Sequence, residues 1–239
     1  MINKVFFDIT NVCNSKCVYC FTDAQDLSVK NLNELSYKNI EKMIDELADV
    51  GVKEISIGGG EPFLKDICRI FNYINGRMRT SVTTNGTIIN NDIIKCLADE
   101  DIRITVSLDS LDQNVSELTR EGINVQHVLY NIEKMLDNSI IKNNLSIRTT
   151  VSKYNINSLI EIVDYCNLNN IKKLKINTVN NFGRAKGNDL NPDFGEFMAT
   201  LDYIIDYCKL NNVFTKISLP IEKYLRTNNR SCTLGCSSI

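Results

Sequence analysis

Short apolar runs rich in valine and isoleucine alternate with stretches of helical spacing along most of the chain. Six such runs have cores that begin near Val5, Ile55, Ser81, Ile104, Ile147 and Leu174. Helical spacing separates them at 35–50, 67–74, 89–97, 125–136 and 159–168. This alternation favours parallel strands joined by right-handed crossovers, in a sheet that helices cover.

The repeating pattern stops two units short of a complete eightfold barrel. After the sixth strand, the spacing predicts a helix over 192–210 and a strand over 213–217. We therefore expect an α/β fold: a partial, open (βα)6 TIM-like barrel with parallel strands. Residues 1–212 would form this barrel domain, and residues 213–239 would form a C-terminal extension.

The composition is that of a folded globular protein. Of the 239 residues, 43% are hydrophobic and 23% are charged, which is close to the average for such proteins. The 27 basic residues are balanced by 29 acidic ones and form no long basic stripe, so we expect no nucleic-acid partner. No apolar run approaches the ~20 residues of a membrane helix, and the first ten residues are unlike a signal peptide. A cytoplasmic protein without a membrane partner is expected.

Polar and glycine-containing segments follow five of the predicted strands. They are TNVCNSKCVYC, GGGEP, TNGT, SLDS and NNFGRA, after the first, second, third, fourth and sixth runs. In parallel α/β folds, functional residues gather on the loops at the carboxyl ends of the strands. The five segments are therefore expected to lie together at one site, at the carboxyl ends of the strands.

Three of the nine cysteines, Cys13, Cys17 and Cys20, lie within eight residues. This C-x3-C-x2-C spacing lets three thiolates converge on one inorganic centre. A cubane iron–sulfur cluster normally takes four cysteines, so three would leave one iron open for reaction. The alternative is a zinc site completed by a distant cysteine or by His127.

Together these segments resemble the radical S-adenosylmethionine (SAM) enzymes over essentially the whole chain, most specifically in the three cysteines with Tyr19 before the last. The resemblance implies that Cys13, Cys17 and Cys20 hold a 4Fe-4S cluster whose fourth iron is chelated by SAM. One electron then cleaves SAM, and the 5'-deoxyadenosyl radical abstracts hydrogen from a substrate.

The resemblance also assigns residues to the binding of SAM. The segment Gly59-Gly60-Glu61 matches the family's GGEP motif, whose backbone and glutamate accept hydrogen bonds from the SAM ammonium. Thr84 and Asn85 match a segment that passes near the cofactor. A simpler interpretation of both is ordinary turn chemistry, with Glu61 capping a first helical turn.

The resemblance assigns four further residues to SAM. Ser107 and Asp109 would bind the ribose hydroxyls, and Arg120 would pair with the SAM carboxylate. Phe182 opens a Gly-Arg-Ala segment that would pass close to the adenine. The alternatives are a helix N-cap at Asp109 or Ser110 and a solvated loop arginine at Arg120, while Asn155 matches a family asparagine only weakly.

The last residues suggest a functional branch. Cys232-Thr-Leu-Gly235 resembles the opening of the SPASM extension, which binds auxiliary clusters in enzymes that modify peptides. A complete extension needs more cysteines than Cys232 and Cys236, so the chain would be a fragment or a natural short form.

The leading hypothesis is a radical SAM peptide maturase that acts on a ribosomally made peptide or protein. It would take electrons from a donor such as flavodoxin or ferredoxin, and its exposed iron would make it sensitive to oxygen. No catalytic base can be named. The alternatives are an enzyme of cofactor biosynthesis that acts on a small molecule, an activase that makes a glycyl radical, and a noncatalytic metal-binding module.

Overall fold

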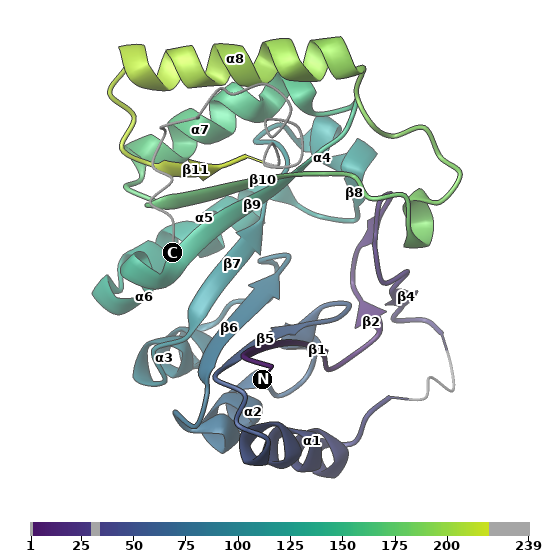
Figure 1. The fold of residues 1–239 in the computed structure, drawn as a ribbon, viewed down its shortest axis with the longest axis vertical. Coiled ribbons are helices and arrows are strands. Elements are labelled where there is room, and N and C mark those ends of the chain that lie inside the picture. Colours follow the sequence, from purple (N-terminus) through teal and green to yellow (C-terminus); the bar gives the residue numbers. More distant parts are fainter. Residues whose placement is uncertain (1, 30–33, 220–239) are drawn as a thin grey trace.

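The computed structural model describes residues 2–29 and 34–219, and its centre is a seven-stranded parallel sheet (Figure 1). The order across the sheet is β1-β5-β6-β7-β9-β10-β11. The strands are β1 (Lys4–Asp8), β5 (Glu54–Gly58), β6 (Arg79–Thr84), β7 (Arg103–Ser107), β9 (Leu145–Val151), β10 (Lys173–Thr178) and β11 (Lys216–Ser218). The six expected strands and their parallel direction are confirmed, and β11 extends the sheet beside β10.

Helices connect these strands in the expected alternation. They are α1 (Tyr37–Asp49), α2 (Ile67–Ile74), α3 (Asn91–Asp99), α4 (Gln113–Thr119), α5 (Val125–Leu136), α6 (Ser139–Asn144), α7 (Leu159–Leu168) and α8 (Phe194–Leu210). Three begin two residues later than expected because a side chain caps each helix: Ser36 accepts the Asn39 N–H before α1, Asn90 accepts the Ile93 N–H before α3, and Asp193 accepts two N–H groups before α8. In Figure 1, α1 and α8 lie beyond opposite ends of the sheet.

Short elements are added in the loops at the carboxyl ends of the strands. They are β2 (Val12–Cys13), β3 (Lys16–Cys17), β4 (Gln25–Asp26), β8 (Arg120–Glu121) and the 3-10 turns η1 (Pro62–Leu64), η2 (Ile156–Ser158) and η3 (Gly183–Ala185). β2 pairs with β4, and β3 pairs antiparallel with β8. Figure 1 shows β2, β4 and β8 gathered on one side of the sheet.

The two faces of the sheet differ in polarity. Alternate strand residues such as Ile55, Val82 and Ile104 are buried against the covering helices in one continuous apolar core. Their neighbours face the other way and are largely polar: Ser56 and Ser81 share a hydrogen bond of 2.7 Å between their hydroxyls. The predicted partial barrel is confirmed as an open sheet with a polar inner face.

The expected domain boundary is not tested by this fold. The division into a 1–212 domain and a 213–239 extension stays a prediction, because residues 220–239, with Cys232 and Cys236, lie outside the described residues. Among the residues that the structure describes, no helix is long and apolar enough to cross a membrane.

Candidate active site

The three clustered cysteines stand on one loop after β1. Cys13 ends β2, Cys17 ends β3, and the Cys20 N–H donates to the Cys17 carbonyl at 3.2 Å. All three are free thiols and line one cavity of about 440 Å³. Burial raises the pKa of Cys13 to about 11, and the charges of Cys17 and Cys20 act in the same direction. Three thiols therefore share one cavity, where a cationic partner would stabilise their thiolates.

The glycine turn after β5 lies directly against this loop. Gly60 donates its N–H to the Thr10 carbonyl, and Glu61 donates its N–H to the Val12 carbonyl, each at 2.8 Å. A Cβ atom on Gly59 would overlap the Thr10 carbonyl oxygen, and one on Gly60 would overlap that of Val12. Glycine is therefore required here for close approach of two main chains, and both glycines line the cavity.

Glu61 links this turn to the loop after β6. Its carboxylate accepts hydrogen bonds from the Thr84 hydroxyl at 2.8 Å, the Asn85 N–H at 2.7 Å and the Phe63 N–H at 3.1 Å. The side chain is fully buried, and burial raises its pKa to about 7 although these donors act to lower it. The expected cap by Glu61 is confirmed at η1, and the carboxylate also fixes Thr84 and Asn85.

The loop after β6 is also tied to the cysteine loop. Asn85 donates its side-chain amide to the Asn14 side-chain oxygen at 2.8 Å, and Asn14 donates to the Thr87 hydroxyl at 2.9 Å. Asn14 lies between Cys13 and Cys17, so these bonds join the third predicted segment, TNGT, to the first. Thr84 and Asn85 both line the cavity.

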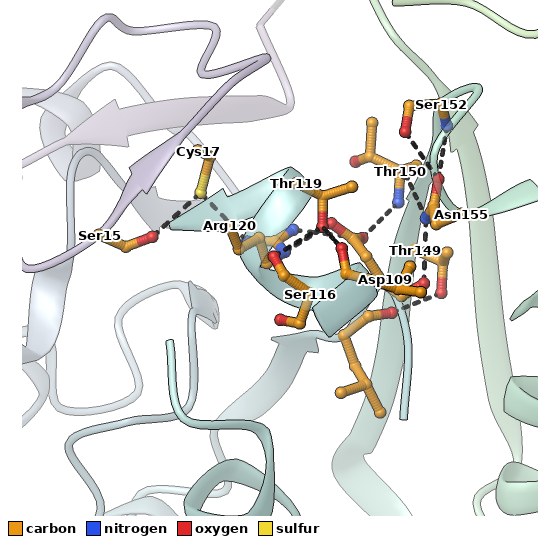
Figure 2. A network of polar contacts seen from close by, with 12 residues as sticks. Ser15, Cys17, Asp109, Ser116, Thr119, Arg120, Thr149, Thr150, Ser152 and Asn155 are labelled. Carbon is orange, nitrogen blue, oxygen red and sulfur yellow. Dashed lines mark hydrogen bonds and ion pairs between the residues drawn. The ribbon is translucent and has the colours of Figure 1, made fainter. Parts of the chain in front are cut away.

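Arg120 and Asp109 form a buried ion pair beside Cys17 (Figure 2). Arg120 Nε donates to Asp109 Oδ2 at 2.7 Å, and Arg120 Nη1 lies 3.7 Å from Cys17 Sγ. The guanidinium also lies over the Tyr19 ring, 5.6 Å from its centroid. Burial disfavours its charge, but Asp109 and Cys17 more than offset this, so the pKa of Arg120 is raised.

Asp109 is held by backbone as well. The Thr150 N–H donates to Asp109 Oδ1 at 2.8 Å, and the Asn155 amide donates to the Asp109 carbonyl at 3.0 Å (Figure 2). The N-cap of α4 is Asp112, so the alternative interpretation of Asp109 or Ser110 as that cap is wrong. The solvated-loop interpretation of Arg120 is wrong as well, because its side chain is buried.

The Gly-Arg-Ala segment closes over the cysteine loop. A Cβ on Gly183 would overlap the Cys20 carbonyl oxygen. Arg184 Nε donates to the Cys17 carbonyl at 2.8 Å, and Arg184 Nη1 donates to the Ala24 carbonyl at 2.7 Å. Sequence reasoning selected Phe182 in this segment and missed Arg184, whose signal was its place directly after a glycine at a strand end.

The cavity fits the cofactors that the motif implies. The buried Tyr19 hydroxyl and Arg184 Nη2 have no hydrogen-bond partner among the described residues, and both residues line the cavity. Such groups indicate room for a polar ligand. Thiolates are the ligands that iron–sulfur clusters take, each on its own iron. Within residues 2–29 and 34–219, no group of three His, Cys, Asp or Glu is placed to hold a single metal ion.

The structure brings most of the predicted site residues to this one cavity. Its lining includes Cys13, Cys17, Cys20, Gly59, Gly60, Thr84, Asn85, Ser107 and Arg120. Glu61 and Asp109 lie behind the wall and orient other groups. Phe182 is exposed and packs edge-on against Phe21, with ring centroids 5.8 Å apart. The individual contacts of these residues with SAM stay predictions.

Relatives by sequence are enzymes that act on small molecules. The chain is 30% identical over 168 residues to GTP 3',8-cyclase of Clostridium perfringens, an alignment that covers 67% of this chain and 51% of the relative. It is 29% identical over 163 residues to Fe-coproporphyrin III synthase of Methanosarcina barkeri, covering 67% of this chain and 40% of the relative. The chain thus spans about half the length of the curated relatives it matches.

Similarity in fold extends over nearly the whole chain. The crystal structure of Streptococcus suis SuiB bound to its precursor peptide SuiA superposes with a TM-score of 0.77 and 20% identity, covering 98% of this chain and 50% of SuiB. SuiB has also been crystallised with S-adenosylmethionine. The family model described as Radical SAM superfamily matches residues 7–166. With the cysteine loop, the glycine turn and the open parallel sheet in one site, the chain belongs to the radical SAM superfamily.

Proposed function

We propose that this chain cleaves SAM reductively and abstracts a hydrogen atom from a residue of a ribosomally made peptide or protein. The superfamily uses a 4Fe-4S cluster and SAM. The observation that carries the proposal is the convergence of three free thiols, the glycine turn and Arg120 on one cavity. When bound, the cluster would supply the electron that cleaves SAM, and SAM would supply the 5'-deoxyadenosyl radical.

The protein's own residues bind and orient these groups. Cys13, Cys17 and Cys20 would supply three thiolates, and the backbone of Gly59 and Gly60, which lines the cavity, would receive the SAM amino group. Thr84 and Asn85, fixed by their bonds to the Glu61 carboxylate, form the adjoining wall.

A second set of residues receives the rest of SAM. Ser107 on β7 binds the ribose, and the segment that begins at Phe182 passes the adenine. Arg120 is held by Asp109 and directs Nη1 toward Cys17. Its positive charge would therefore stabilise two anions, the Cys17 thiolate and the SAM carboxylate.

A peptide substrate is supported by the fold comparison and by the exposed side chains near the site. SuiB, whose structure superposes over 98% of this chain, was crystallised with a precursor peptide. Phe21 and Phe182 next to the cysteine loop are 64% and 63% exposed, and Phe6 on the cavity wall is 76% exposed. Large exposed apolar side chains around a cleft suit an extended chain with side chains of its own.

To test the proposal, the protein is reconstituted with its cluster and incubated with SAM, dithionite and peptides encoded beside the gene of this protein. Mass spectrometry then follows both the peptide and 5'-deoxyadenosine. A peptide that loses hydrogen in step with 5'-deoxyadenosine formation supports the proposal. If every peptide is unchanged while GTP or a tetrapyrrole is consumed, the peptide assignment is wrong.

A small-molecule substrate is the second candidate. The observation that favours it is sequence similarity of about 30% to GTP 3',8-cyclase and Fe-coproporphyrin III synthase. The same incubation separates the two candidates, because each predicts a different consumed substrate. In either case the chain needs a one-electron donor, for which we propose flavodoxin or ferredoxin.

A further inference from the structure

Two basic side chains stand next to each other on the inner face of the sheet. Arg148 of β9 and Lys175 of β10 are direct partners in the parallel register. Strand side chains alternate between faces, so both point the same way as Thr150 and Asn177, which line the cavity. Arg148 itself lines it. The inner face of the sheet therefore carries a pair of cations, of which Arg148 lines the cavity.

Neither cation has an acidic partner among the described residues. Arg148 Nε is buried and makes no hydrogen bond there. Two other basic residues of the inner face, Arg79 and Arg103, both form an ion pair with Glu54, with the shorter N–O distance 2.6 Å. Arg148 and Lys175 differ from these residues because their charges are left without an acid.

The surroundings of this pair add positive rather than negative charge. Burial, and then the charge of Arg120, lower the pKa of Arg148. Burial also lowers the pKa of Lys175, as do four neighbouring cations: Arg148, Lys4, Lys173 and Arg103. The carboxylate that lines the cavity belongs to Asp8 on β1, a strand at the edge of the sheet. Burial is the cause of its raised pKa, and neither Arg148 nor Lys175 acts to lower it.

We propose that the inner wall is a substrate-binding site for an anion, in which the Arg148 guanidinium, with Lys175 beside it, binds a carboxylate or phosphate of the substrate. A partly buried cation is costly without a partner, and a guanidinium matches the two oxygens of either group. The inference rests on the proposed function and deepens it, because it names the chemistry that the substrate must present.

The test is calorimetric titration of the cluster-loaded, SAM-saturated protein at constant ionic strength. Inorganic pyrophosphate and glutarate are the two probes, so the arms distinguish a phosphate from a carboxylate. Arg148→Gln should weaken binding of the effective probe at least about tenfold, the loss of one charged hydrogen-bonding group. Arg148→Lys should restore part of it, and Lys175→Gln should weaken it less. Arg79→Gln, a cation already paired with Glu54, is the matched control and should leave binding unchanged.

Binding of either probe that depends on Arg148 supports the site and identifies its chemistry. The proposal is overturned if neither probe binds or if Arg148→Gln binds as tightly as the unchanged chain. A parallel titration without SAM completes the test: a probe that binds only in the absence of SAM would assign Arg148 to the SAM carboxylate and overturn the proposal. The absorption of the cluster near ~400 nm shows that each variant is folded and loaded. Because titration needs no turnover, its outcome is separate from whether 5'-deoxyadenosine forms.

Discussion

The Arg120 guanidinium is bound to the Asp109 carboxylate at 2.7 Å, with Asp109 fully buried and Arg120 9% exposed. Two residues expected to contact different parts of SAM therefore contact each other. Asp109 anchors Arg120 through Nε, which leaves Nη1 directed at Cys17 Sγ. The pair thus fixes a positive charge beside the cysteine that the motif assigns to the cluster.

Asp109→Ala should strongly destabilise the protein. Removing the carboxylate leaves the buried Arg120 charge unpaired, which costs about 3–5 kcal/mol. Urea unfolding of the apo chain under anaerobic conditions measures this. Asp206→Ala removes an exposed carboxylate near Lys209 and should cost less than about 1 kcal/mol. Equal stability of the two variants would contradict a structural role for the buried pair.

Glu61 should make the apo protein less stable as the pH rises toward neutrality. Its pKa is about 7 in the folded protein, against an ordinary value of 4.5 for a glutamate, so the folded state keeps the proton to a higher pH than the unfolded chain does. The stability that protonated Glu61 contributes is fully present below the pKa of the unfolded chain. It is lost as the pH rises from that value through the pKa of the folded protein. It amounts to about 3 kcal/mol.

Urea unfolding at about pH 5 and about pH 7 tests the role of Glu61. In Glu61→Gln the decline in stability between these values should shrink by most of that amount. Glu46→Gln, which changes an exposed side chain of α1, should keep the same decline in stability as the unchanged chain. An identical pH dependence in all three proteins would show that Glu61 does not titrate in this range.

Gly60→Ala should weaken SAM binding. The added Cβ overlaps the Val12 carbonyl oxygen, so the glycine turn has to move away from the cysteine loop. Gly51→Ala is the control: nothing lies within 4 Å of its Cβ, and its positive φ costs only about 1–2 kcal/mol locally. Equilibrium dialysis with SAM compares the affinities of the two variants. Unchanged affinity in Gly60→Ala would contradict a role in SAM binding for the close contact between the glycine turn and the cysteine loop.

Arg184→Ala should loosen the cysteine loop. It removes the donors to the Cys17 and Ala24 carbonyls, a loss of about 1–3 kcal/mol if these oxygens stay without partners. The reconstituted variant should lose its absorption near ~400 nm several-fold faster in the presence of an iron chelator. Lys186→Ala, in the next exposed position, should lose it at the normal rate. The same rate in both variants would exclude Arg184 as a positioning residue.

The sheet and the cysteine loop could be predicted because their signals are local. Each strand is a run of apolar residues, and Cys13, Cys17 and Cys20 lie within one loop. The short strands β2, β3, β4 and β8 could not be predicted, because two-residue pairings leave no periodic pattern.

The polarity of the inner face was harder to see. In the first strand, Phe6 and Phe7 look equally apolar in the sequence, yet Phe6 is 76% exposed and Phe7 is buried. The partners of Asp109, Arg148 and Arg184 depend on contacts between segments far apart in the chain. Such contacts follow from the packed fold and not from spacing.

The most direct test of the account is the formation of 5'-deoxyadenosine by the protein reconstituted anaerobically with iron and sulfide, then given dithionite and SAM. The unchanged chain and Cys68→Ala, a cysteine of α2 outside the cavity, should both form it, while Cys17→Ala should form none and lack the absorption near ~400 nm. Formation of 5'-deoxyadenosine by Cys17→Ala at the normal rate, or its absence from a fully iron-loaded unchanged chain, would contradict the assignment of this cavity to SAM cleavage.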